Sequence, residues 1–336
     1  MPASAVLRHV IESISPASAA HAAAARRGVA HAGAPLLERL AAALGGAQHT
    51  PRPRGARRTI VVCAGDHGAG DPGIALGAAH PTVIAAREIA GGTAALARVA
   101  RAAAAPIVLV DAGAVEAAFL PPTAVRLGRG PSRDLLREPA MTVVDAALSL
   151  EAGIALAVSL ADAGLDVLAV GAIGVGSELA AAALLGAAVG AGAAVGAGTA
   201  LGARDESALD ADLQGAAARG AELAGAGAGA LERLAALGGP DTAVLAGLLL
   251  GAASMNVPIV LDGHATGAAA LAAAAFAPAV AGSLIAAHTG TSPHPRILAY
   301  LGLAPLFEVG LGHGEGTGAA MVLPLIDQVT SLASRG

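Results

Sequence analysis

Short apolar runs rich in Val, Ile and Leu alternate with long alanine-rich stretches along most of the chain. Each run ends in small or polar residues, and the stretch that follows it is long enough for a helix, so the pattern predicts alternating strands and helices. The predicted strands are residues 59–64, 106–110, 166–170, 258–261 and 283–287, with a weaker candidate at 193–198. Such alternation is typical of the α/β class, with a mostly parallel sheet and helices on both faces in a Rossmann-like three-layer arrangement.

Two regions depart from this alternation. Residues 1–54 have helical spacing and end in a loop rich in Pro and Arg, so we expect a small helical cap or arm there. Residues 201–240 are more polar and predict a helical insert that ends at Gly-Gly-Pro. The α/β catalytic domain is therefore predicted to comprise residues 55–200 and 241–325, followed by a C-terminal tail at 326–336.

The composition excludes several classes of protein. The formal net charge is −5, aromatic residues make up 1% of the chain and lysine is absent, so we expect no nucleic-acid partner. Cys63 is the only cysteine, which excludes an intrachain disulfide framework and a CxxC metal site. The histidines lack the close spacing of a zinc site, and we expect no metal. The first thirty residues contain no compact apolar segment, so we expect a cytoplasmic protein without a signal peptide.

Two uncharged windows raise the question of a membrane. Residues 179–203 and 243–261 are long enough to approach the length of a membrane span. Both consist mainly of Ala and small residues, and neither has flanking aromatic belts. Elements buried in an α/β core lose their charges in the same way. We therefore expect no membrane partner.

Polar residues stand directly after the predicted strands. Because ligands bind outside the carboxyl ends of parallel strands, these residues are candidates for a binding site, although structural hydrogen bonding is an alternative for the aspartates. They are Asp66, His67, Asp111, Asp262, His264 and His288.

A glycine-rich turn follows the strand at 166–170. Gly174, Val175, Gly176 and Ser177 lie between this strand and the next helix, where backbone N–H groups can bind a phosphate or carboxylate. The turn matches neither a dinucleotide fingerprint nor a Walker loop, because its third glycine position is occupied by Leu179 and the chain has no lysine. A tight turn that serves only packing remains the alternative.

One carboxylate near the end of the chain is flanked by glycines. Residues 312–320 read Gly-His-Gly-Glu-Gly-Thr-Gly-Ala-Ala, with Glu315 between Gly314 and Gly316. Glycines allow the backbone to approach a ligand closely, so Glu315 is a candidate catalytic residue. The alternative is a surface loop whose carboxylate points into water.

Taken together, these segments resemble the nicotinate-nucleotide:dimethylbenzimidazole phosphoribosyltransferases in both order and spacing. The similarity extends over about residues 34–325. The segments that carry it are residues 33–40, 64–68, 81 with 91–92, 110–111, 139–142, 174–176, 198–199, 238–239, 258–263, 288, 301–303 and 314–319.

The resemblance implies a homodimeric α/β enzyme that needs no metal or other cofactor and acts on small-molecule substrates. The implied reaction moves the phosphoribosyl group of nicotinate mononucleotide to 5,6-dimethylbenzimidazole, giving α-ribazole phosphate and nicotinate. It assigns the catalytic base to Glu315. Substrate contacts are implied at Gly174, Val175, Gly176, Ser177, Arg87, His313, Gly314 and Gly316, with Asp66, His67, Asp262 and His288 as further candidates at the strand ends.

The chain departs from the family pattern in both expected pockets. Where the family usually has Glu-Met-Gly-Ile-Gly-Asn-Thr-Thr, residues 172–179 read Ala-Ile-Gly-Val-Gly-Ser-Glu-Leu. The family's phosphate-binding lysine is absent, which leaves Arg129 and Arg204 as candidate replacements. Arg87 matches a glutamine that helps to line the base pocket, and His313 matches a leucine. A paralogue with another acceptor or donor, or a nucleotide-binding or base-binding protein without turnover, therefore remains an alternative.

Overall fold

The computed structural model describes residues 4–68, 73–190, 206–312 and 314–333. Within these residues a single six-stranded sheet has the order β3-β2-β1-β4-β5-β6, and every neighbouring pair is parallel. The strands are β1 (Arg58–Gly65), β2 (Ile107–Gly113), β3 (Val125–Arg126), β4 (Val167–Ile173), β5 (Ile259–Leu261) and β6 (Leu284–Ala286). The predicted α/β class with a parallel sheet is confirmed.

The central strand β1 shows why the apolar runs are continuous. Its residues pair with β2 on one side and β4 on the other, and the positions from Ile60 to Gly65 are buried. Ile60 and Val62 belong to one apolar cluster, whereas Val61 and Cys63 belong to the other. A strand with a core on each face cannot alternate with polar residues, which produces the uninterrupted runs of the sequence.

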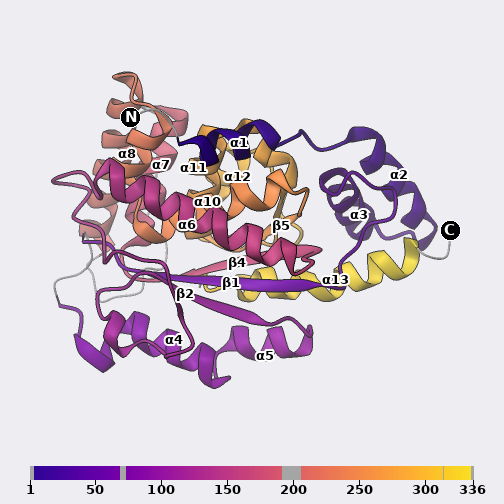
Figure 1. Cartoon of the computed structure of the whole chain (residues 1–336), viewed down its shortest axis with the longest axis horizontal. Helices are drawn as coiled ribbons and strands as arrows, with labels where there is room; N and C mark the ends of the chain where they lie inside the picture. The colour runs from indigo at the N-terminus through magenta and orange to yellow at the C-terminus, as the bar shows by residue number, and fades with distance from the viewer. Residues whose placement is uncertain (1–3, 69–72, 191–205, 313, 334–336) are drawn as a thin grey trace.

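Helices cover both faces of this sheet (Figure 1). One layer contains α4 (Pro81–Gly91), α5 (Ala95–Ala102) and α13 (Thr317–Ala333), which share the cluster of Ile60 and Val62. The other layer contains α6 (Val143–Asp162), α7 (Ser177–Val189), α10 (Pro240–Ser254) and α11 (His264–Phe276). The remaining helices are α1 (Ala5–Ser13), α2 (Ala19–Val29), α3 (Pro35–Ala47), α8 (Glu206–Gly225), α9 (Ala230–Leu237) and α12 (His294–Tyr300), with short 3-10 turns at Ala30–Ala32, Gly77–Ala79, Ala117–Phe119 and Pro278–Ser283.

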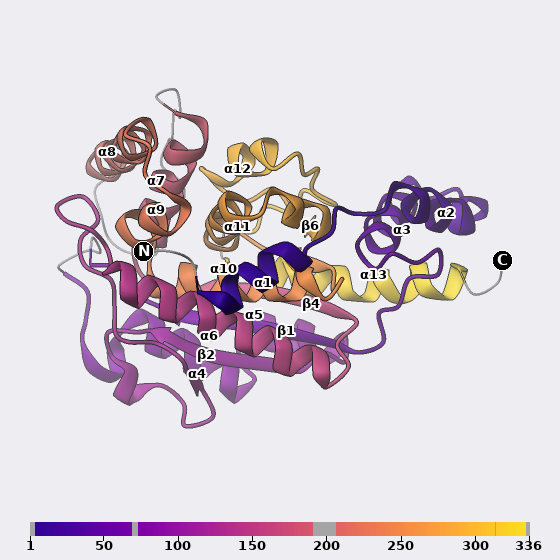
Figure 2. The same ribbon diagram turned by 45° about the horizontal axis from the view of Figure 1, so that its top comes forward.

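The N-terminal helices take two positions. α2 and α3 pack on each other at one end of the molecule, beside the C-terminal part of α13 (Figure 2). α1 lies apart from them and packs against α10 through Leu7 and Val10. The division of the chain into cap, catalytic domain and insert stays a prediction.

The C-terminal helix crosses the boundary that the sequence suggested at residue 325. α13 continues to Ala333, and Val322, Ile326, Val329 and Ala333 are buried along it. Their spacing of four, three and four residues forms one apolar stripe, so residues 326–333 belong to the core-facing helix.

The strand pattern was predicted well except at its edge. Each of the five main predicted runs overlaps a strand, whereas β3 was missed because its two residues are exposed and carry no apolar pattern. The weaker candidate at 193–198 lies outside the described residues.

Among the described helices, α6 is long and apolar enough to cross a membrane, with a mean hydropathy of 1.8. A single helix of this kind is weak evidence, because helices packed inside globular proteins also meet this criterion. α6 packs lengthwise on α10, whose residues are buried almost without exception.

Candidate active site

A cavity of about 450 Å³ lies at the carboxyl end of β4, between α4 and the loop that precedes α13. This volume lies within the usual range of small-molecule sites. Most of its lining is apolar or glycine, with carboxylates contributed by Glu88 and Glu315. The lining residues are Pro81, Thr82, Ile84, Ala85, Glu88, Ala94, Ala95, Ala172, Ile173, Gly174, Gly314 and Glu315.

Glu315 is half-buried in this cavity, and its loop lies directly on the sheet. Its Oε1 atom accepts a hydrogen bond of 2.8 Å from the Thr317 hydroxyl. The Ala172 amide donates to the Gly314 carbonyl over 2.9 Å. A Cβ atom at Gly171 would approach the Glu315 carbonyl oxygen within 2.2 Å, so only glycine fits there. The backbone around Glu315 is therefore fixed by β4.

Asp262, at the end of β5, holds the other side of this loop. Its carboxylate is fully buried and accepts hydrogen bonds from the Gly316 amide over 2.8 Å and from the Ala319 amide over 2.9 Å. These amides lie at the N-terminal end of α13, where N–H groups have no partner within the helix. Asp262 thus caps α13 from another strand, and the Glu315 carboxylate is left to face the cavity.

The buried imidazole of His288 supports Asp262. Its Nε2 atom lies 3.3 Å from Oδ1 of Asp262, within ion-pair distance. Burial alone would lower the pKa of His288, but the neighbouring Asp262 carboxylate outweighs it, and the pKa is raised. Neither Asp262 nor His288 lines the cavity; both hold the loop that carries Glu315.

Asp66 connects three segments around the same edge of the sheet. Its Oδ1 atom accepts from the Thr82 hydroxyl over 2.6 Å and from the Val175 amide over 3.0 Å. Its Oδ2 atom accepts from the Val115 amide over 2.9 Å. All these partners belong to the protein and the side chain is buried, so its geometry favours the structural alternative.

His67 forms a second buried pair, with Asp241 in the first turn of α10. The Nε2 and Oδ1 atoms are 3.2 Å apart. Burial opposes the charge on each partner, but their mutual attraction outweighs it, so the pKa of His67 is raised and the pKa of Asp241 is lowered. His67 is therefore buried in the core and does not line the cavity beside Glu315.

The glycine-rich turn connects the cavity to the start of α7. Gly174 lines the cavity, and Gly176 has a φ of 83° at the N-cap of α7. The hydroxyl of Ser177 lies 3.1 Å from Nε2 of His264. Burial is the main cause that lowers the pKa of His264, which favours its neutral form. Phosphate binding at this turn remains a prediction.

The structure does not place either candidate arginine, Arg129 or Arg204, in contact with this turn. Arg129 pairs with Asp145 over 2.9 Å, and Arg204 lies outside the described residues. His313 also lies outside them. Among the residues that can be placed, no group of three or more His, Cys, Asp or Glu side chains could hold a metal ion.

Of the two neighbouring residues Arg87 and Glu88 on α4, only Glu88 lines this cavity. Arg87 donates from Nε to the Phe119 carbonyl over 3.1 Å and is absent from the cavity lining. Glu88, which was not predicted, lines it together with Ile84 and Ala85. The signal that could have found Glu88 is its helical spacing from Pro81, Ile84 and Ala85.

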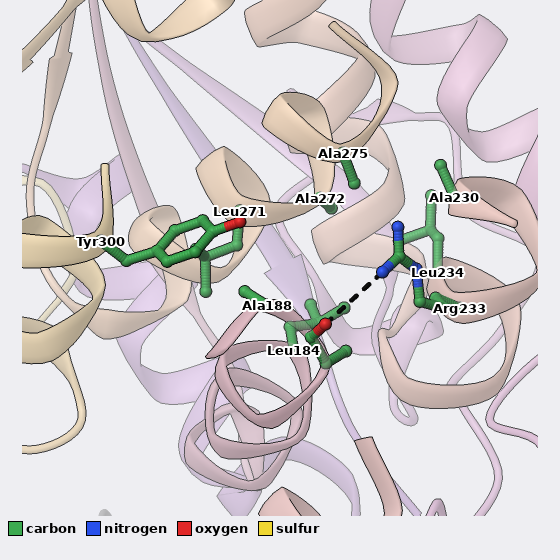
Figure 3. Close-up of a pocket in the computed structure, with 10 residues that line it drawn as sticks. Leu184, Ala188, Ala230, Arg233, Leu234, Leu271, Ala272, Ala275 and Tyr300 are labelled. Atoms are coloured by element: carbon green, nitrogen blue, oxygen red, sulfur yellow. Dashed lines mark hydrogen bonds between the residues drawn. The ribbon is translucent and has the colours of Figure 1, made fainter. Parts of the chain in front are cut away.

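A second, smaller cavity of about 100 Å³ lies between α7, α9 and α11. Figure 3 shows that Arg233 points toward Leu184 and Ala188, with Tyr300 on the opposite side. The Arg233 guanidinium donates to the Ala187 carbonyl over 3.4 Å, near the C-terminal end of α7. None of the predicted site residues lines this cavity, whereas Gly174, Gly314 and Glu315 line the cavity beside β4, which is therefore the candidate active site.

Acid is expected to weaken folding through His294. Burial, with further contributions from His288 and His264, lowers the pKa of His294 to about 3, and its Nδ1 atom accepts from the Gly290 amide over 3.0 Å. An unfolded histidine titrates near 6.5, so the unfolded state binds more protons between about pH 6.5 and 3, and stability falls as the pH drops through that window. Between pH 7 and 4.5, the free energy of unfolding measured in urea should fall by roughly 2–3 kcal/mol less in the His294→Asn variant than in the wild type. Parallel pH profiles would contradict this assignment.

The parallel sheet, the carboxylate at its carboxyl edge and the apolar cavity beside it together define an α/β enzyme that acts on a small molecule. The chain matches the sequence profile described as phosphoribosyltransferase over residues 11–335, and it belongs to that family. The family resemblance and the enzyme class inferred from the sequence are thereby confirmed.

Relatives with the same printed name extend over most of the chain. The nicotinate-nucleotide–dimethylbenzimidazole phosphoribosyltransferase of Roseiflexus sp. (strain RS-1) is 36% identical, covering 86% of this chain and 82% of the relative. Its counterpart from Salinispora tropica is also 36% identical, covering 87% and 84%. The crystal structure of CobT from Thermus thermophilus superposes with a TM-score of 0.80 at 32% identity, covering 94% of this chain and 96% of that one.

Proposed function

We propose that this chain transfers the phosphoribosyl group of nicotinate mononucleotide to a ring nitrogen of 5,6-dimethylbenzimidazole, forming α-ribazole phosphate and nicotinate. The observation that carries the proposal is Glu315, which faces a cavity of about 450 Å³ with a largely apolar lining. The names of the relatives, at 32–36% identity over most of the chain, support the same reaction.

The chemistry explains why a carboxylate suffices. One ring nitrogen of the benzimidazole attacks the anomeric carbon of the ribose with its lone pair. The bond to the pyridinium nitrogen breaks, and its electron pair neutralises the pyridinium as nicotinate leaves. The other ring nitrogen loses its proton to Glu315. General-base catalysis of this kind contributes about 10²–10⁴ in rate.

The structure supports positions for both substrates. The flat acceptor ring would bind in the cavity between α4 and β4, beside Glu315. The donor phosphate would bind at the glycine-rich turn, where the N-terminus of α7 presents its amides. Attack and departure on opposite sides of the ribose would invert the anomeric carbon and give the α-riboside. A cytoplasmic homodimer belongs to the same proposal.

A paralogous transfer to a different acceptor is the second candidate. Ala172 lines the cavity at a position where the family usually has an acid, and Glu178 stands in the first turn of α7. These changes alter the surroundings of the substrates and leave Glu315 in place.

The purified chain should convert nicotinate mononucleotide and 5,6-dimethylbenzimidazole into α-ribazole phosphate, detected by mass spectrometry. A product with another aromatic acceptor, and none with dimethylbenzimidazole, would support the paralogous transfer. Saturable binding of either substrate without turnover of any pair would contradict the proposed reaction and favour a binding protein.

A further inference from the structure

The wall of the cavity opposite Glu315 carries a second carboxylate. Pro81, Ile84, Ala85 and Glu88 of α4 all line the cavity, and their spacing of three, four and seven residues places them on one face of the helix. Glu88 therefore lies on the same face of α4 as these apolar residues, and this face covers the proposed position of the acceptor. Arg87 lies one residue away, off that stripe, and contacts the Phe119 carbonyl.

The backbone of Glu88 is fixed, whereas its carboxylate is available. Its carbonyl accepts hydrogen bonds from the Thr93 and Ala94 amides over 2.9 and 3.2 Å, which end α4 and begin the turn to α5. The side chain is exposed. Across the part of the chain that the structure places, the carboxylate has no hydrogen bond or ion pair.

An ionised carboxylate can only accept hydrogen bonds. A methyl group placed against the carboxylate displaces water, and the carboxylate then lacks the hydrogen bond that the water donated. A hydroxyl or amino group donates a hydrogen bond in its place. Apart from the two glutamates and Thr82, whose hydroxyl donates to Asp66, every residue that lines the cavity is apolar or glycine and offers no competing polar side chain.

We propose that Glu88 is a specificity-determining residue, and that it favours acceptors whose benzo ring carries a hydrogen-bond donor, such as a hydroxyl or amino group, over methyl-substituted acceptors. Dimethylbenzimidazole remains a substrate under this proposal, with a lower kcat/KM than a hydroxylated acceptor. The inference rests on the proposed function, because it assigns the cavity to the acceptor ring. Glu315 takes the ring N–H proton, while Glu88 binds the substituent from the other wall.

Two nearly isosteric acceptors test this selection: 5-hydroxybenzimidazole and 5-methylbenzimidazole, each with nicotinate mononucleotide. The ratio of their kcat/KM values should favour the hydroxyl compound about tenfold in the wild type, since a charge-assisted hydrogen bond is weakened by partial exposure to water. The ratio should fall to about one in Glu88→Leu and take an intermediate value in Glu88→Gln. The matched control is Glu12→Leu, an exposed glutamate on α1, which lies on the opposite side of the sheet from α4 (Figure 1).

No preference in the wild type, or a preference unchanged in Glu88→Leu, would overturn the proposal. Absence of turnover with both acceptors would contradict the proposed function instead. In that case calorimetric titration of the two compounds still tests the role of Glu88. Tighter binding of the hydroxyl compound than of the methyl compound in the wild type, but not in Glu88→Leu, supports the proposal. Equal affinities for the two compounds in both the wild type and Glu88→Leu overturn it. Glu88→Gln, which keeps the shape of the side chain, replaces Glu88→Leu if the latter fails to fold.

Discussion

Replacement of Glu315 by glutamine is expected to lower kcat by about 10²–10⁴-fold with little change in acceptor affinity. The amide keeps the size of the side chain and can still accept the hydrogen bond from Thr317, which is 2.8 Å long in the wild type. It cannot take the proton that the acceptor nitrogen must lose. Single-turnover kinetics with nicotinate mononucleotide and dimethylbenzimidazole, together with calorimetric titration of the acceptor, separate the two effects.

Glu12→Gln is the matched control, because it makes the same substitution on an exposed position of α1. Unchanged turnover in Glu315→Gln would remove Glu315 from the role of general base. An equal loss in the control would point to a general defect of the variants.

Asp262→Asn should reduce both stability and turnover. The amide nitrogen would face one of the two amide donors, Gly316 or Ala319, and His288 would lose its counter-ion in a fully buried position. Removing one partner of a buried ion pair typically costs about 3–5 kcal/mol. Because the same two amides hold the loop of Glu315, kcat measured on the folded fraction should also fall, by at least about tenfold.

Asp241→Asn provides the comparison for this variant. It changes an equally buried Asp–His pair, but Asp241 makes no described contact with residues 314–319. Its stability loss in urea unfolding should be similar, whereas its kcat should remain closer to that of the wild type. Equal losses of kcat in the two variants would show that Asp262 stabilises the fold without positioning Glu315.

The strands could be predicted from the sequence because burial on both faces requires an uninterrupted run of apolar residues. Each residue from Ile60 to Cys63 is apolar whichever cluster it joins, so the run itself marks the strand. β3 has no such run, since Val125 and Arg126 lie at the exposed edge of the sheet. The glycines beside Glu315 likewise gave a local signal, which reflects the close approach of this loop to Gly171.

The remaining parts of the candidate site depend on contacts between distant segments. Asp262 and Gly316 are 54 residues apart, and nothing local to either indicates that one binds the other. The rotation of α4 about its axis determines whether Arg87 or Glu88 faces the cavity. Contacts with neighbouring loops, such as that of Arg87 with Phe119, fix this rotation. Adjacent positions on a helix differ by about 100°, so a small error of alignment exchanges a cavity residue for a surface one.

The two walls of the cavity differ in the substitutions that they tolerate, because no side chain fits at Gly171 on the β4 side. On the β4 side a single added methyl group would collide with the backbone that carries Glu315. On the α4 side Ile84 and Glu88 are exposed and can change size or polarity without moving that backbone. New acceptor specificities in this protein, whether selected in the laboratory or acquired by descent, should therefore accumulate on α4 at positions 84, 85 and 88 before they reach the loop of the base.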